Sequence, residues 1–110
     1  MRQYVIDELR PAELDRIKDY LDNYCERSDI GSIFWLRIPD DMLTSVQSGH
    51  VDCRPHYAAV ELGDRFVNFE MLIRSREKIR CNCVAFATPE QRDFILSFAD
   101  AMLDKTEIKV

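Results

Sequence analysis

The segment after residue 87 constrains the fold most strongly, because it combines a clear helix start with an almost continuous apolar surface. Residues 88–91 (Thr-Pro-Glu-Gln) offer an N-cap threonine, a proline in the first turn and a glutamine three residues after the cap. Within the helix predicted over residues 89–104, residues 94–103 are polar only at Ser97 and Asp100. A helix that covers one face of a sheet needs a single apolar stripe. This helix has more apolar surface than that, which self-association would explain.

A second amphipathic helix is predicted from Pro11 to about Arg27, since apolar residues recur there at steps of three and four. Residues 3–8 alternate loosely and predict a short edge strand. Between the two helices, β-forming residues dominate. The elements expected there are a strand at 33–38, a two-turn helix capped by Asp40 or Asp41 and ended by Gly49, a loop at 49–56, and strands at 57–62, 66–74 and 79–87.

Gly63 and Asp64 separate two of these strands and predict a tight hairpin. Glycine at the first of two loop positions is typical of a type II′ turn. This turn would place Leu62 opposite Arg65 and would keep apolar residues on one face of both strands.

The resulting order, (β)-α-β-α-β-β-β-α, predicts an α+β fold. We expect a two-layer sandwich in which two main helices pack on one face of a largely antiparallel sheet of four to five strands. A chain of 110 residues is expected to form one domain, residues 1–110. If residues 3–8 join the sheet, the helical crossover would make them parallel to the strand at 33–38.

The net charge and the N-terminal sequence limit the partners and the cellular location that we expect for this protein. Fifteen basic against twenty acidic residues give a net charge of −5, which disfavours nucleic acid and anionic membrane surfaces as partners. The N-terminus has no apolar signal segment, and no apolar run is long enough to cross a bilayer. We therefore expect a cytoplasmic protein whose four cysteines are reduced.

The best constellation for chemistry is His50-x-x-Cys53-x-x-His56 together with Cys81-x-Cys83. Imidazole and thiolate are the ligands that zinc prefers, and a loop at 50–56 is short enough to chelate. However, this spacing matches none of the common zinc signatures. A regular strand would also hold the two later sulfurs almost 7 Å apart. The alternative is that these cysteines are small buried core residues.

Other cysteine chemistry has less support from the sequence. A redox-active cysteine needs a lowered pKa, which a helix N-terminus or a nearby cation provides. Cys81 and Cys83 do not begin a predicted helix, and Arg80 points to the opposite face of the predicted strand. A nucleophilic Cys53 beside His50 or His56 would need a third group to orient the imidazole. The three glycines cannot build a phosphate-binding loop.

The sheet face opposite the helices combines aromatic and charged residues, which favours a contact surface. Arginine and glutamate stems that cover the rings are the alternative explanation. The residues expected in a contact surface are Trp35, Arg37, Tyr57, Glu70 and Arg80. Our first hypothesis is thus a non-enzymatic interaction module without a cofactor, which binds a protein partner or a second copy of itself as a homodimer. The second is a zinc or small-ligand site around His50, Cys53 and His56, with Cys81 and Cys83 in reach.

Overall fold

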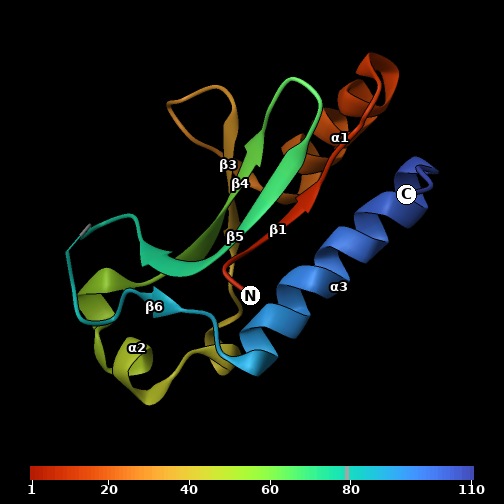
Figure 1. Ribbon diagram of the computed structural model, residues 1–110. Helices are drawn as coiled ribbons and strands as arrows, with labels where there is room; N and C mark the ends of the chain where they lie inside the picture. The colour runs from red at the N-terminus through yellow and green to blue at the C-terminus, as the bar shows by residue number, and fades with distance from the viewer. Residues whose placement is uncertain (79) are drawn as a thin grey trace.

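The computed structural model describes residues 1–78 and 80–110 and confirms the α+β class, with an antiparallel sheet on one side and two long helices on the other (Figure 1). The elements in chain order are β1 (Gln3–Ile6), α1 (Pro11–Tyr24), β2 (Glu26–Arg27), β3 (Ile33–Arg37), the short 3-10 helix η1 (Asp40–Met42), α2 (Ser45–Gly49), the 3-10 helix η2 (Val51–Cys53), β4 (His56–Leu62), β5 (Val67–Ser75), β6 (Ala85–Phe86) and α3 (Pro89–Thr106).

The sheet has the order β1-β5-β4-β3-β2, and β6 also pairs with β5. Every pairing is antiparallel, including β1 with β5, where Tyr4 lies opposite Phe69. The prediction that the first strand would run parallel to the strand at 33–38 is therefore wrong. The β4–β5 hairpin occupies the positions between them, so α1 connects the two edges of the sheet rather than two neighbouring strands.

The hairpin between β4 and β5 is wider than predicted. Leu62 pairs with Val67 instead of Arg65, and the backbone N–H of Gly63 donates to the carbonyl of Phe66 at 2.8 Å. Gly63 does not adopt the positive φ that a type II′ turn requires. The four-residue loop moves the register by two positions, so the same residues still face the helices.

The core lies between the sheet and the two helices. Ile17 and Leu21 of α1, and Ile95 and Met102 of α3, are fully buried in it. The alternating apolar residues of the predicted strands are all buried there, namely Phe34, Leu36, Ile38, Val60, Val67, Phe69 and Met71. The period-2 alternation of the strands thus predicted the correct inner face.

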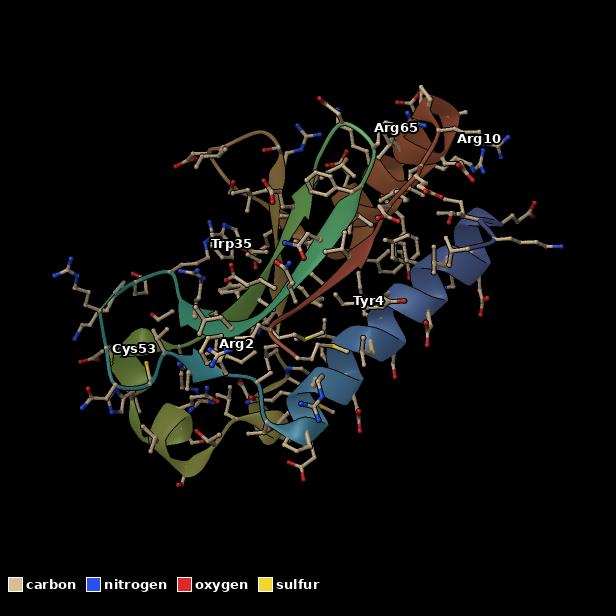
Figure 2. The ribbon with its side chains drawn as sticks, in the orientation of Figure 1. Arg2, Tyr4, Arg10, Trp35, Cys53 and Arg65 are labelled. Atoms are coloured by element: carbon tan, nitrogen blue, oxygen red, sulfur yellow. The ribbon has the colours of Figure 1, made fainter. Side chains whose placement is uncertain are left out.

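The broad apolar surface of α3 is covered largely within this chain. Phe94, Leu96 and Phe98 are half-buried against the core. The ring of Phe98 also meets Tyr20 of α1 edge-on, with 5.7 Å between the ring centroids. Tyr4 projects from β1 toward α3 and packs on the same core (Figure 2). Because α3 contacts both the sheet and α1, it needs apolar residues on more than one side.

Three segments differ from their predicted form, and the differences shape the site. The helix from Pro11 ends at Tyr24 because residues 26–27 pair with β3. The predicted two-turn helix is two short ones, and Thr44 caps the second of them. The strand predicted at 79–87 is confined to Ala85–Phe86, residues 81–84 form a turn, and Ile79 lies outside the described residues.

Candidate metal centre

His50 and Cys53 lie at the two ends of a single 3-10 turn. His50 follows the last residue of α2 and caps η2, which ends at Cys53. The backbone N–H of Cys53 donates to the carbonyl of His50 at 2.9 Å. Residues three apart in a 3-10 turn project to the same side. The spacing His-x-x-Cys therefore directs both side chains toward one point.

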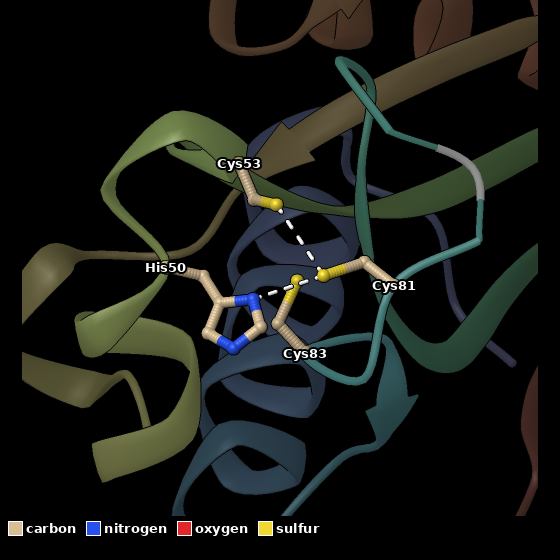
Figure 3. Close-up of side chains that lie close together, drawn as sticks. All are labelled: His50, Cys53, Cys81 and Cys83. Atoms are coloured by element: carbon tan, nitrogen blue, oxygen red, sulfur yellow. Dashed lines mark hydrogen bonds between the residues drawn. The ribbon is translucent and has the colours of Figure 1, made fainter.

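Cys81 and Cys83 belong to a turn and not to a strand. The backbone N–H of Val84 donates to the carbonyl of Cys81 at 3.1 Å, which closes the turn. Strand geometry, which would separate the two sulfurs, therefore does not apply here. The turn lets both thiols face the His50–Cys53 segment (Figure 3).

The four side chains converge on one position. Nδ1 of His50 lies 2.9 Å from Sγ of Cys81, and Sγ of Cys53 lies 3.5 Å from the same sulfur (Figure 3). All four ligand atoms, including Sγ of Cys83, are within 4.8 Å of one another. Tetrahedral zinc with nitrogen and sulfur ligands places these atoms about 3.5–3.8 Å apart. Small side-chain adjustments would thus surround one ion.

Burial differs sharply within this group. Cys53 and Cys83 are 2% and 1% exposed, whereas His50 and Cys81 are half-buried. A hollow of about 330 Å³ leads to the group from outside, with Lys78 on its wall. The centre therefore has two ligands anchored in the interior and two near the surface.

The sulfurs of Cys81 and Cys83 have very different acidities. The backbone N–H of Cys83 and then its thiol donate to Cys81, which lowers the pKa of Cys81 to about 6. Burial, followed by the neighbouring sulfurs of Cys81 and Cys53, raises the pKa of Cys83 to about 12. Cys83 stays protonated because burial disfavours the negative charge of its thiolate. A bound metal cation would compensate that charge.

His56, which the sequence included among the ligands, is not part of this group. It is fully buried at the start of β4, and neither ring nitrogen has a hydrogen-bond partner among the described residues. Burial, and next the charge of Arg54, lowers the pKa of His56. Its strand position explains its exclusion, since alternation along β4 places it on the same face as Ala58 and Val60, in the core. Cys25 is also elsewhere, and burial raises its pKa to about 12.

Two residues that the sequence did not identify as part of the site form hydrogen bonds to the backbone of the ligand residues. Gln47 donates through Nε2 to the carbonyl of Cys83 at 3.2 Å, and the hydroxyl of Ser75 donates to the carbonyl of Cys53 at 2.7 Å. Gln47 has one local signal, because it follows Thr44 by three residues as in a capping box. Ser75 has none, since its partner is 22 residues away.

The predicted contact residues occupy different environments. Trp35 is half-buried on the outer sheet face (Figure 2). Its ring meets that of Tyr57 edge-on, with 6.3 Å between the ring centroids. Tyr57 is only 5% exposed and donates its hydroxyl to Glu26 at 2.9 Å. The guanidinium of Arg76 lies 5.5 Å and 5.3 Å from the Trp35 and Tyr57 ring centroids. Arginine thus covers part of this aromatic surface, as the alternative explanation expected.

The three charged members of that predicted surface differ in exposure. Arg37 is exposed and lies 3.6 Å from Asp40, whereas Glu70 is half-buried and pairs with Arg74 at 2.7 Å. Arg80 is exposed, directly before the Cys81 turn. Arg37 lies opposite Tyr57 in the β3–β4 pairing, and Arg74, the partner of Glu70, lies opposite Tyr57 in the β4–β5 pairing.

No family model, curated protein or solved structure matches this chain. Within the residues that the structure describes, no helix is both long and apolar enough for a membrane crossing. The chemistry of the four converging ligands is therefore the basis for inferring function.

Proposed function

We propose that this protein binds one zinc-type metal ion through His50, Cys53, Cys81 and Cys83, and that the ion has a structural role. One observation carries the proposal: four ligand atoms from two distant segments lie within 4.8 Å of one another. Four protein ligands fill a tetrahedral zinc ion, as in structural Cys3His sites, whereas catalytic zinc retains an open position.

The donor atoms select the kind of metal. Three sulfurs and one imidazole nitrogen are soft or borderline ligands, which suit zinc and disfavour calcium and magnesium, since those require oxygen. In iron–sulfur clusters inorganic sulfide bridges the irons, and each protein sulfur binds an iron directly, so the protein ligands lie further apart than around a single ion. Ligand atoms that all lie within 4.8 Å of one another favour a single ion over such a cluster.

The ion would join two segments that have few other links. The segment at 50–53 precedes β4, and the turn at 81–83 follows β5. Of the residues in these two segments, Cys53 and Cys83 are the buried apolar ones. Metal ligation forms only in the folded state, so its free energy stabilises the fold. Three thiolates around a divalent ion would leave one negative charge, near Lys78 on the wall of the hollow.

The experiment that tests this function is elemental analysis of untagged protein purified without chelators, followed by titration of metal-stripped protein with zinc. We expect about one zinc per chain, and Cys83→Ser should abolish tight binding. Cys25→Ser is the matched control, because Cys25 is a half-buried thiol outside the group. Stoichiometric iron in place of zinc would change the metal but retain the site. Protein that neither contains nor takes up a metal would refute the proposal.

We propose self-association through the outer sheet face as a second function. Its support is that both long helices cover the other face, and that Trp35 lines a hollow of about 420 Å³ together with Arg74 and Arg76. Tryptophan and arginine are enriched at interface hot spots. Sedimentation velocity should then show a dimer that Arg37→Glu weakens and the helix-layer control Lys18→Glu does not. A wild-type monomer at every concentration measured would contradict it.

A further inference from the structure

Gln47 contacts both halves of the candidate metal centre. Its backbone carbonyl accepts the N–H of His50 at 3.2 Å. Its side-chain Nε2 donates to the carbonyl of Cys83 at 3.2 Å. Gln47 is 1% exposed, so these bonds are shielded from water. One side chain therefore connects the ligand segment at 50–53 with the turn at 81–83.

The orientation of this amide is fixed by its other bonds. Oε1 of Gln47 accepts the backbone N–H of Thr44 at 3.0 Å and Nε2 of Gln91 at 2.9 Å. Gln91 is itself fully buried and also donates to the carbonyl of Met42 at 2.9 Å. Two donors on the oxygen leave the nitrogen of Gln47 as the group that faces Cys83.

We infer that Gln47 is a positioning residue of the metal centre. By holding the carbonyl of Cys83, it keeps the turn at 81–83 within ligating distance of His50 and Cys53 before a metal arrives. Residues that orient metal ligands in this way raise metal affinity, because less chain must be ordered on binding. This inference rests on the proposed metal-binding function.

Zinc affinity, measured by competition with a chromophoric chelator, tests the inference. Removal of an outer partner of a metal ligand typically weakens binding about 10–100-fold, which we expect for Gln47→Met. Gln47→Glu keeps the acceptor for Thr44 and Gln91 but loses the donor to Cys83, so it should also weaken binding. Thr106→Val is the control, since it removes a buried side-chain hydrogen bond, from the Thr106 hydroxyl to the carbonyl of Met102, that lies outside the metal centre.

A purely structural role for Gln47 would give a different result. Gln47→Met would then lower the stability of the metal-free and zinc-bound forms equally, and zinc affinity would not change. The absorption spectrum of the cobalt-substituted protein is a second readout, because a displaced Cys83 alters the coordination geometry. Unchanged zinc affinity and an unchanged cobalt spectrum in both Gln47 variants would overturn the inference. Failure of the wild-type protein itself to bind zinc would instead refute the proposed function.

If the variants do not fold, nuclear magnetic resonance of the wild-type protein tests the positioning role of Gln47. The side-chain amide protons of Gln47 should shift and exchange more slowly with solvent when zinc is added. The side-chain amide of Gln3, exposed on β1, should remain unaffected. A Gln47 amide that does not respond to zinc would overturn the inference.

Discussion

Nε2 of Gln91 donates a hydrogen bond to Oε1 of Gln47 at 2.9 Å, and this bond joins the first turns of α3 and α2. Each glutamine also closes a capping box, with Thr88 and Thr44 respectively. Local helix-start signals thus provide the side chains that hold α2 and α3 together.

Gln91→Met should destabilise the protein by about 2–3 kcal/mol, because the buried amide oxygen of Gln47 and the partly buried carbonyl of Met42 would each lose a donor. Urea denaturation of the metal-free protein measures this free energy of unfolding. Gln3→Met, at an exposed site, serves as the control. A change below about 0.5 kcal/mol, as at ordinary surface sites, would contradict the prediction.

Metal removal should lower thermal stability. With free zinc at 100 times its dissociation constant, ligation stabilises the folded state by about 2.7 kcal/mol. A strong chelator should therefore reduce the melting temperature of the wild type and of Cys25→Ser, measured by circular dichroism. Cys83→Ser should melt at the same temperature with and without the chelator. A chelator effect in Cys83→Ser would indicate that the metal binds elsewhere.

Cys81 should be the most reactive thiol of the metal-free protein. Its pKa of about 6 makes it a thiolate at neutral pH, whereas the pKa of Cys83 and that of Cys25 are raised to about 12. Iodoacetamide labelling, located by tandem mass spectrometry, should be nearly constant above pH 7 and slow as the pH falls through 6. Zinc should protect Cys81. Labelling that rises steeply between pH 8 and 9 would show an ordinary thiol.

His56 should make metal-free protein less stable in acid. Burial lowers the pKa of His56, so the unfolded chain, with a pKa of about 6.5, binds the proton more readily than the folded chain does. This contribution to stability is fully present above about pH 6.5 and is lost as the pH falls through the lowered folded pKa. His56→Leu should weaken that decline and raise stability at neutral pH, since neither ring nitrogen has a described partner. Urea denaturation across pH with a chelator present measures this, and equal slopes for both proteins would contradict it.

Gly63→Ala should destabilise the protein by about 1 kcal/mol through contact and not through backbone strain. A Cβ at Gly63 would overlap the ring of Phe66, while the φ of Gly63 is not positive. The same substitution in a Phe66→Ala background should therefore cost almost nothing, as chemical denaturation would show. An equal cost in both backgrounds would mean that the backbone conformation itself requires glycine.

Features that depend on residues close in the chain could be predicted from the sequence. The start of α3 at Thr88 follows from its own capping residues, and the inner face of the sheet follows from period-2 alternation. The same is true of His50 and Cys53, whose spacing suits a single turn. The ligand types were therefore recognisable, and so was the α+β class.

Only the tertiary structure decided which of those residues meet. The turn that frees Cys81 and Cys83 from a strand, and its approach to His50, depend on the hairpin of β4 and β5 and on the bond from Gln47 to Cys83. These are contacts between residues about 30 positions apart, and the free energy that selects them comes from packing of the whole core. That packing cannot be read from residues that are neighbours in the sequence. The sequence by itself therefore determined the α+β class and the types of ligand, whereas the tertiary structure determined which of those ligands form the site.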